Sequence, residues 1–250
     1  MYYIAEVGSF SYSKPTKKIN EDFLLLPTYD LDANIVFGIA DGVGSSEYAD
    51  RISKSVINAT NQLLQKENFS IENALNNAKS TIKKLASVNE KYVEAATAFT
   101  LVQIQKDNII IGHIGDCRVY VKKQNKLIQL TKDHTRYQEL VDEGELSIKK
   151  LKQHRERLSS ILTKALTSSF ELKFDLIKIP VHTLMSDGTL IMSLMSDGAH
   201  SHWQSRPKFS ENTMNSPLAF TSSLYKRVRK SPKDDFTCLT LKVEQEFICD

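Results

Sequence analysis

The chain has 250 residues, of which 41% are hydrophobic and 25% are charged, and its formal net charge is +3. This composition is typical of a globular protein that buries a substantial core in one large domain or two small ones. The mild charge, without a basic run interleaved with aromatic residues, argues against a nucleic-acid-binding protein. The densest basic cluster is Lys226, Arg227, Arg229 and Lys230, which we interpret as the solvated face of a helix.

The cysteines and the apolar segments indicate the compartment. Three cysteines, Cys117, Cys238 and Cys249, form no CxxC pair, so we expect neither a disulfide framework nor a zinc site. We therefore expect the protein in a reducing cytoplasm. Residues 1–15 lack the basic and long apolar regions of a signal peptide. No stretch approaches the roughly 20 apolar residues of a membrane span, so we expect a cytoplasmic protein without membrane contact.

Apolar runs near the start of the chain predict three strands, at residues 2–10, 23–26 and 34–40. We expect Pro27 to stop the second strand, because proline has no amide hydrogen to donate to a sheet. Asn20-Glu21-Asp22 precedes the second strand, and Asp41-Gly42 ends the third. Two neighbouring strands are therefore predicted to present acidic residues near their ends.

Helical periodicity follows over residues 47–66 and again over residues 71–85. Ser70 precedes the second helix and Glu72 lies in its first turn, so Ser70 is the predicted N-cap. Both helices are interpreted as covers of the core and are assigned no chemistry.

Runs at residues 96–104, 109–114 and 118–121 predict meandering antiparallel strands, followed by a turn over residues 122–126. His113 lies within the second of these strands. We interpret it as a histidine that is satisfied in the core or on a sheet face, rather than as a ligand.

A helix is predicted over residues 136–143, ended by Gly144. The stretch 146–166 is polar and helical, with weak hydrophobic periodicity, and we interpret it as an insertion or flap. A further strand is expected over residues 174–181.

The tripeptide Ser-Asp-Gly occurs twice, and its two copies are interpreted differently. Asp187-Gly188 lies between two apolar runs, where Asp-Gly is a common hairpin turn. Asp197-Gly198 follows the predicted strand 189–195 and so repeats the arrangement at Asp41-Gly42. We therefore assign chemistry to Asp197 and a turn to Asp187.

The end of the chain predicts an irregular stretch at residues 201–217, a helix at 218–229 and a last strand at 236–243, which Asp234-Asp235 precedes. We find no internal repeat, low-complexity segment or long linker. One domain is the simplest interpretation.

Acidic residues thus gather where strands end. Like charges repel, so these carboxylates need either basic partners or cations. Basic residues are sparse in the sequence beside Asp41, Asp197 and Asp234, which favours cations. Oxygen ligands without a histidine or cysteine cluster indicate Mg²⁺ or Mn²⁺. Two such ions sharing a carboxylate would polarise a phosphoryl group and generate a hydroxide nucleophile.

Other routes to phosphate hydrolysis fit poorly. A cysteine phosphatase needs several residues between its thiolate and its arginine, whereas Cys117 and Arg118 are adjacent. The sequence contains no Walker-type loop, no HExxH and no GxSxG.

Seven short segments carry motifs that occur together in one known family. In chain order they are Lys17-Lys18-Ile19-Asn20-Glu21-Asp22, Asp41-Gly42-Val43-Gly44-Ser45, Thr97-Ala98-Phe99-Thr100, Gly115-Asp116-Cys117-Arg118, Leu130-Thr131-Lys132-Asp133-His134, Ser196-Asp197-Gly198 and Asp234-Asp235-Phe236-Thr237. They resemble, in the same order, the R-x-x-N-E-D, D-G-x-G-G, Gly-Thr-Thr/Ser, G-D-S-R, L-T-x-D-H, S-D-G and D-N/D-x-T motifs of metal-dependent PP2C-type (PPM) protein serine/threonine phosphatases, in their short bacterial form.

The resemblance implies an α+β fold, with a central β-sandwich of two antiparallel sheets flanked by α-helices in four layers, α-β-β-α. It implies a single phosphatase domain over residues 1–250, with a flap-like insertion around residues 143–166.

The resemblance also implies a centre of two Mn²⁺ or Mg²⁺ ions. Asp41 would bridge the ions, and the Gly42 carbonyl would be a further ligand. Asp197 and Asp234 would hold the first ion. Glu21 would reach the second ion through water.

Other family positions have supporting roles. Asp22 would support the metal ligands, and Asp116 corresponds to the aspartate of a third, weaker metal site in bacterial members. Asp133 and His134 are interpreted as structural, because their motif begins the helix before the flap.

Three departures from the family pattern matter. Lys17 replaces the arginine that grips the substrate phosphate, and lysine lacks a planar bidentate fork. We therefore expect weaker substrate binding, unless Lys14 or Lys18 shares the task. Ser45 replaces a glycine and is expected to strain or reshape its loop. Val43 stands where many eukaryotic members have a histidine, so no general acid is expected there.

The implied reaction is attack of a metal-bound water or hydroxide on phosphoserine or phosphothreonine in a protein, with Asp41, Asp197 and Asp234 catalytic through that water. The expected partners are a phosphoprotein substrate and a cognate Ser/Thr kinase, and the chain is expected to be a monomer. The departures at Lys17 and Ser45 leave open a catalytically weak module of this fold that binds a phosphoprotein partner. A hydrolase of small phosphorylated metabolites is a third hypothesis.

Overall fold

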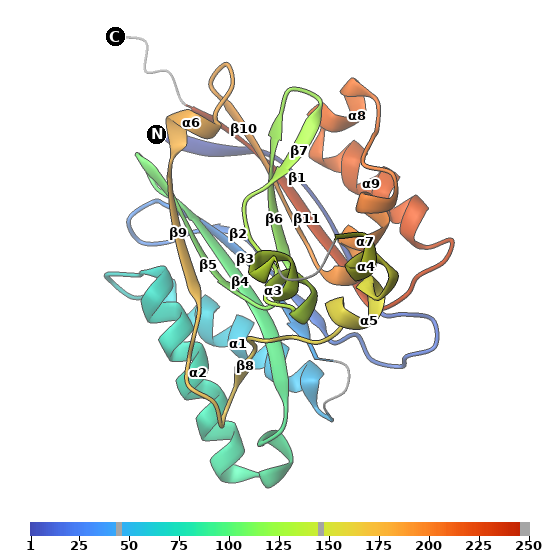
Figure 1. Ribbon diagram of the computed structural model, residues 1–250. Coiled ribbons are helices and arrows are strands. Elements are labelled where there is room, and N and C mark those ends of the chain that lie inside the picture. The colour runs from blue at the N-terminus through green and yellow to red at the C-terminus, as the bar shows by residue number, and fades with distance from the viewer. Residues whose placement is uncertain (44–46, 145–147, 246–250) are drawn as a thin grey trace.

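The computed structural model describes residues 1–43, 47–144 and 148–245, so the expectation for Ser45 lies outside the described residues. Two antiparallel sheets pack face to face, and helices cover the outer face of each (Figure 1). This is the predicted four-layer α+β sandwich. Among the described helices, none is long and apolar enough to cross a lipid bilayer.

The first sheet contains both ends of the described chain. Its strand order is β1 (Tyr2–Tyr12), β11 (Phe236–Gln245), β10 (Thr189–Met195), β6 (Arg118–Lys123) and β7 (Lys126–Gln129). The second sheet runs β2 (Asp22–Tyr29), β3 (Ile35–Gly42), β4 (Ala96–Ile104), β5 (Asn108–Ile114) and β9 (Asp175–Pro180), with β8 (Leu166–Thr167) paired to β4.

The central strands are buried on both faces, because each sheet lies between the other sheet and a helical layer. On β3, Ile35, Phe37 and Ile39 pack in the core between the sheets. Val36 and Ala40 point the other way, into the core beneath the helices. This alternation follows from the two-residue period of a strand.

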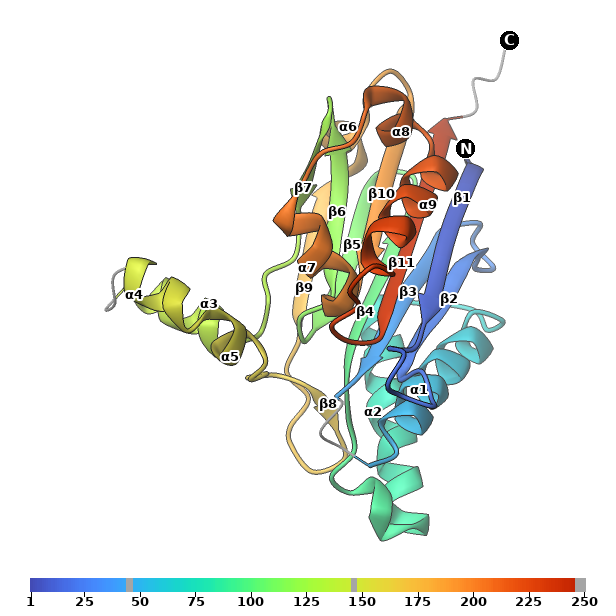
Figure 2. The same ribbon diagram turned by 90° about the vertical axis from the view of Figure 1, so that its right-hand side faces the viewer.

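Helices close the two outer faces. Helices α1 (Ala49–Leu63) and α2 (Ile71–Val88) cover the second sheet, while α7 (Asp197–Ser205), α8 (Glu211–Asn215) and α9 (Pro217–Val228) cover the first (Figure 2). The N-cap prediction is confirmed, since the Ser70 side chain accepts a hydrogen bond from the Asn73 amide. Two short helices, η1 (Glu90–Tyr92) and α6 (Val181–Leu184), complete connections.

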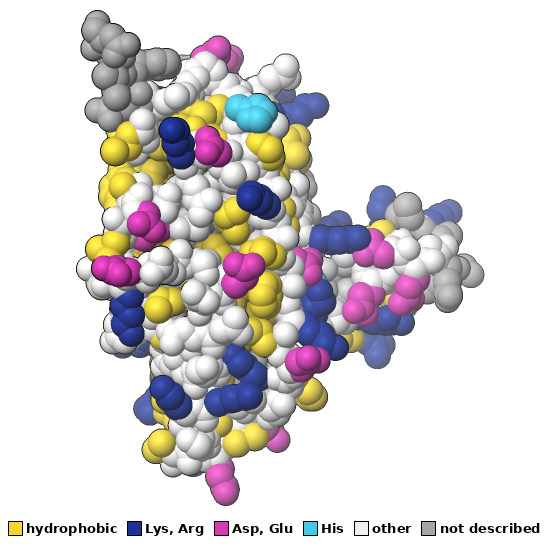
Figure 3. All heavy atoms as spheres, turned by 90° about the vertical axis from the view of Figure 1, so that its left-hand side faces the viewer, with side chains coloured by type: hydrophobic (Ala, Val, Ile, Leu, Met, Phe, Trp, Pro, Cys, Tyr) yellow, Lys and Arg dark blue, Asp and Glu magenta, His cyan; other side chains and the backbone are white. Residues whose placement is uncertain are grey.

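Three helices project from the body: α3 (Arg136–Glu143), α4 (Ile148–Gln153) and α5 (Arg155–Ser159) (Figure 2). We call them the helical projection. Gly144 ends α3 as predicted, with a φ of 69°. Basic and acidic side chains are interspersed over the body and the projection on the face drawn in Figure 3.

Two local predictions were wrong, at Pro27 and at residues 201–217, and a third was right within narrower bounds. Strand β2 continues through Pro27 to Tyr29, because it lies at a sheet edge and its pairing with β3 is irregular between Leu25 and Thr28. The turn predicted at residues 122–126 is confirmed as a tight hairpin between β6 and β7, although strand β7 itself was not predicted. The stretch expected to be irregular contains most of α7 and all of α8, whose Trp203 and Met214 are buried against the first sheet.

Candidate metal centre and active site

The register of β2 and β3 brings the first two acidic segments together. Asp22 and Asp41 lie opposite each other in this pair. The Gly42 amide donates a hydrogen bond to the Glu21 carbonyl at 3.1 Å. The Thr97 hydroxyl lies 2.9 Å from the Asp41 carbonyl and fixes β3 against β4. The predicted meeting of acidic strand ends is confirmed here.

The second Ser-Asp-Gly joins three strands at the same end of the sandwich. The Ser196 hydroxyl donates to Asp22 Oδ2 at 2.9 Å and accepts from the Thr237 amide at 2.9 Å. Asp197 is then the first residue of α7. A Cβ on Gly198 would lie 2.0 Å from the Asp235 carbonyl oxygen, so this position requires glycine.

The first Ser-Asp-Gly forms the predicted turn. Asp187 and Gly188 have φ values of 50° and 71°, and Ser186 bridges to Thr189 across them. Positive φ at both central residues is the geometry of a tight hairpin turn.

Four aspartates at this end of the sandwich destabilise one another's ionised forms. Withdrawal from water raises the pKa of Asp22 to about 7, and the charge of Asp197 adds to the increase. The pKa of Asp197 rises to about 6 through burial and the charge of Asp234. Burial and neighbouring carboxylates also raise the pKa of Asp41 and of Asp116 well above the ordinary value.

The donor chemistry of this cluster fits a hard divalent cation. Its carboxylates repel one another, and the buried Asp22 Oδ1 has no hydrogen-bond partner, so a cation would relieve both costs. In the described segments, however, no three Asp, Glu, His or Cys side chains converge into a metal cage. The assignment of individual ligands therefore stays a prediction.

Lys17 corrects the expectation that basic residues are sparse near these carboxylates. Its Nζ lies 2.7 Å from Glu21 Oε2 and 2.9 Å from Asp234 Oδ1. Desolvation opposes its charge, but these hydrogen bonds raise the pKa of Lys17 above its ordinary value. The ammonium group thus lies between two of the predicted metal ligands.

Asp235, which the sequence identified only as part of a motif, is a structural residue of the site. Its carboxylate accepts hydrogen bonds from the Lys14 amide and the Glu21 amide, each at 2.8 Å. The side chain is buried. It therefore anchors the loop that carries Lys17 and Glu21 to the start of β11.

We predict that Asp235→Ala lowers the free energy of unfolding by about 3 kcal/mol, because two amides lose a charged acceptor. Asp235→Asn is expected to lose less, since its amide oxygen still accepts. Urea unfolding of both variants without metal measures the difference. Equal losses in the two variants would contradict the anchoring role.

The turn that carries Asp116 is held by the segment around His134. The His134 amide donates to the Gly115 carbonyl at 2.8 Å, and the Gly115 amide donates to His134 Nδ1 at 3.1 Å. Arg118 forms a two-pronged ion pair with the buried Asp133, with Nε 2.7 Å from Oδ1. These contacts confirm the structural interpretation of Asp133 and His134.

His113 is a satisfied core histidine, as predicted. Its Nδ1 lies 2.9 Å from the Thr100 hydroxyl, and its Nε2 lies 3.0 Å from the Lys132 carbonyl. Burial, with the nearby His134, lowers the pKa of His113 to about 4.

This lowered pKa predicts acid sensitivity. Unfolded histidine binds a proton below about pH 6.5, whereas folded His113 does so only near pH 4. The contribution of His113 to stability is therefore present above pH 6.5 and is lost as the pH falls towards 4. In urea unfolding, the free energy of unfolding of the wild type is expected to approach that of His113→Gln as the pH falls over this range, and the difference between them should shrink by up to about 3 kcal/mol. A difference in free energy of unfolding that does not change with pH would contradict the prediction. The variant His182→Gln, at an exposed histidine, is the control.

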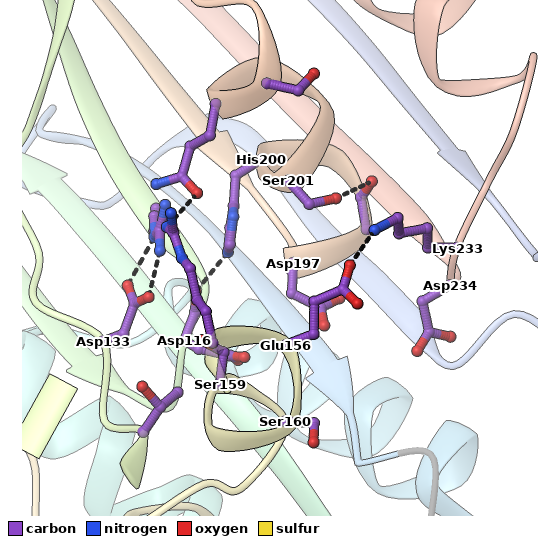
Figure 4. Close-up of a pocket in the computed structure, with 16 residues that line it drawn as sticks. Asp116, Asp133, Glu156, Ser159, Ser160, Asp197, His200, Ser201, Lys233 and Asp234 are labelled. Atoms are coloured by element: carbon purple, nitrogen blue, oxygen red, sulfur yellow. Dashed lines mark hydrogen bonds and ion pairs between the residues drawn. The ribbon is translucent and has the colours of Figure 1, made fainter. Parts of the chain in front are cut away.

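A cavity of about 650 Å³ opens beside the acidic cluster (Figure 4). Asp116, Asp197 and Asp234 line its inner side, and α5 lies across it. Two contacts join α5 of the helical projection to the body of the protein beside this cavity. Lys233 forms an ion pair with Glu156 at 2.5 Å, and Arg155 donates a hydrogen bond to Gln204 at 3.0 Å. These residues were not predicted from the sequence, because a weak core pattern indicates a flap without indicating what it contacts.

A family model described as protein phosphatase 2C matches residues 15–231. The chain therefore belongs to the protein phosphatase 2C family. It is similar to the serine/threonine phosphatase stp of Listeria welshimeri, with 29% identity over 177 residues, or 64% of each chain. It is also 28% identical over 137 residues to PstP of Mycobacterium tuberculosis, covering 53% of this chain and 26% of that protein. The matches span less than two thirds of these curated relatives.

Solved structures share the fold. The crystal structure of Mycobacterium tuberculosis PstP matches with a TM-score of 0.77 at 22% identity, covering 98% of this chain and 100% of that one. Stp1 from Staphylococcus aureus matches with a TM-score of 0.78 at 18% identity, covering 98% and 96%. The catalytic domain of PstP in complex with two manganese ions gives 0.76 at 21% identity, covering 98% and 100%; the manganese ions are those of PstP.

Proposed function

We propose that this chain is a metal-dependent protein serine/threonine phosphatase that opposes a Ser/Thr kinase. One observation carries the proposal: Asp22, Asp41, Asp116 and Asp197 come from separate strand ends to the side of an open cavity, where burial and neighbouring carboxylates raise the pKa of each. Such a cluster is costly unless it binds cations. Family membership and the named phosphatase relatives support the same proposal.

The proposed ligands are the oxygen donors at these strand ends. Asp41, the Gly42 carbonyl, Asp197, Asp234 and Glu21 would hold two Mn²⁺ or Mg²⁺ ions, and Asp116 would hold a third. When bound, such ions polarise phosphoryl oxygens and lower the pKa of water.

The chain's other residues position these donors. Ser196 orients Asp22, and Asp235 fixes the loop of Glu21. His134 holds the turn of Asp116. Lys17 would place a positive charge beside the substrate phosphate once released from its carboxylate partners. Activity as a monomer in the cytoplasm, with a cognate kinase, is part of the same proposal.

The first test is hydrolysis of a phosphothreonine peptide by metal-depleted protein, with and without added Mn²⁺ or Mg²⁺. We expect turnover only with the metal, and its loss on adding EDTA. Phosphorylated metabolites assayed in parallel should be poor substrates. Faster turnover of a metabolite would replace the protein-phosphatase proposal with the metabolite hypothesis.

A specific observation favours a second candidate, a weakly catalytic module that binds a phosphoprotein. Lys17 already supplies a cation to Glu21 and Asp234, so part of the acidic cluster is balanced without metal. Folded protein that binds Mn²⁺ and the phosphopeptide but does not release phosphate would support this candidate.

A further inference from the structure

A second cavity, of about 550 Å³, lies between α9 and the segment that joins α7 to α8. These elements lie on the outer face of the first sheet (Figure 2). Five cationic residues line the cavity: Arg206, Lys208, Lys226, Arg227 and Lys230. No acidic residue is among its described lining residues. We call this cavity the basic groove.

Arg227 connects the two sides of the basic groove. Its guanidinium donates to the Arg206 carbonyl at 2.5 Å and to the Lys208 carbonyl at 3.1 Å. It also lies 4.2 Å from the centre of the Phe209 ring, a cation–π contact. Arg227 therefore fixes the segment 206–208 against α9, and Arg206 and Lys208 line the same cavity as Lys226 and Lys230.

The charges of the groove are not balanced locally. Lys226 and Lys230 are four residues apart on and just after α9, a spacing at which like charges repel. Within the described chain, no ion pair joins any of the five cationic residues to a carboxylate, whereas Lys132, Lys233 and Lys242 elsewhere each pair with one. Burial and the nearby Arg206 lower the pKa of Arg227. An anionic ligand would relieve this repulsion.

The groove adjoins the proposed active site. Ser205 lines the active-site cavity, and the next residue, Arg206, lines the basic groove. Helix α7 runs from Asp197 to this junction, and its nine residues span about 13 Å at 1.5 Å per residue. An extended peptide covers that distance in about four residues.

We propose that the basic groove binds an acidic segment of the phosphoprotein substrate, at least about four residues from the phosphorylated side chain. This inference rests on the proposed function and deepens it by naming the substrate class. A protein segment fits better than a nucleic acid, because the cavity beside the groove would take a phosphorylated side chain and the net charge of the chain is only +3.

The test compares phosphothreonine peptides with neutral flanks and with a run of glutamates beginning four residues before or after the phosphothreonine. For the wild type, one acidic peptide is expected to have a kcat/KM about tenfold above the neutral peptide, decreasing with salt. The double variant Lys226→Glu/Lys230→Glu should lose this preference and keep its activity on the neutral peptide. Lys83→Glu/Lys84→Glu, with the same charge change on exposed residues of α2, should keep both.

Absence of the preference in active wild type, or its persistence in the Lys226→Glu/Lys230→Glu variant, would overturn the inference. If neither peptide is hydrolysed, the proposed function fails, and the groove is then tested alone by fluorescence anisotropy with a labelled, unphosphorylated glutamate peptide. Binding that requires Lys226 and Lys230 would support the groove, and absence of binding would overturn it. Tighter binding of a single-stranded oligonucleotide of equal charge would overturn the protein-segment proposal.

Discussion

Replacing Asp41 by asparagine is expected to give a protein that is more stable without metal and inactive with it. Burial and three neighbouring aspartates raise the pKa of Asp41, so its charge is costly when no cation is present. Asparagine removes that charge, and we expect the free energy of unfolding in EDTA to rise by about 1–3 kcal/mol. The phosphopeptide kcat/KM in Mn²⁺ should fall by more than about 100-fold, beyond the effect typical of residues that only orient a metal ligand.

Urea unfolding in EDTA and in Mn²⁺, with turnover measured on the same preparations, checks both parts. Asp187→Asn is the matched control, because Asp187 occupies the other Ser-Asp-Gly as a turn residue with positive φ, a conformation that asparagine tolerates. If Asp41→Asn were as active as Asp187→Asn, the proposed metal centre would be wrong.

Lys17→Met is expected to strengthen metal binding while weakening substrate binding. The Lys17 ammonium lies within hydrogen-bond distance of Glu21 and Asp234, so an ion held by these carboxylates must displace it. Removing this competing cation should lower the Kd for Mn²⁺ by about tenfold, or 1.4 kcal/mol. The KM for a phosphopeptide should rise, because the variant has one positive charge fewer for the phosphate.

Isothermal titration of metal-depleted protein with Mn²⁺ measures the first effect independently of activity. The neighbouring, exposed Lys18→Met is the control for the loss of charge. A Kd for Mn²⁺ that is the same in Lys17→Met and Lys18→Met would mean that Lys17 does not compete with the ion. A higher phosphopeptide KM in Lys18→Met would instead indicate that Lys18 shares the phosphate.

The sequence predicted most of the sandwich, because buried strands carry a two-residue period and the long helices a period of 3.6 residues. It also predicted that two neighbouring strands present acidic residues near their ends, which the pairing of Asp22 with Asp41 confirms. Pattern alone missed α7 and α8, which are short and depend on the burial of Trp203 and Met214 for their place.

Contacts between segments that are distant in the sequence could not be predicted for a different reason. Asp235 bonds to amides more than two hundred positions earlier in the chain, and local spacing carries no signal for such a partner. The basic groove likewise joins Lys208 to Lys226 across α8 and most of α9. The sequence therefore indicated a solvated helix face where the structure forms a cavity.

The pairing of β1 with β11 has a consequence for synthesis on the ribosome. Tyr2 lies opposite Gln245 in this pair, so β1 stays without this partner until β11 has been synthesised. The segment that carries Asp234 and Asp235 is made long after Glu21, and until then the Glu21 loop lacks the hydrogen bond to Asp235 that anchors it. A growing chain therefore holds Glu21, Asp22 and Asp41 before Asp197 and Asp234 exist, and these carboxylates can come together only after the segment that leads into β11 has been made.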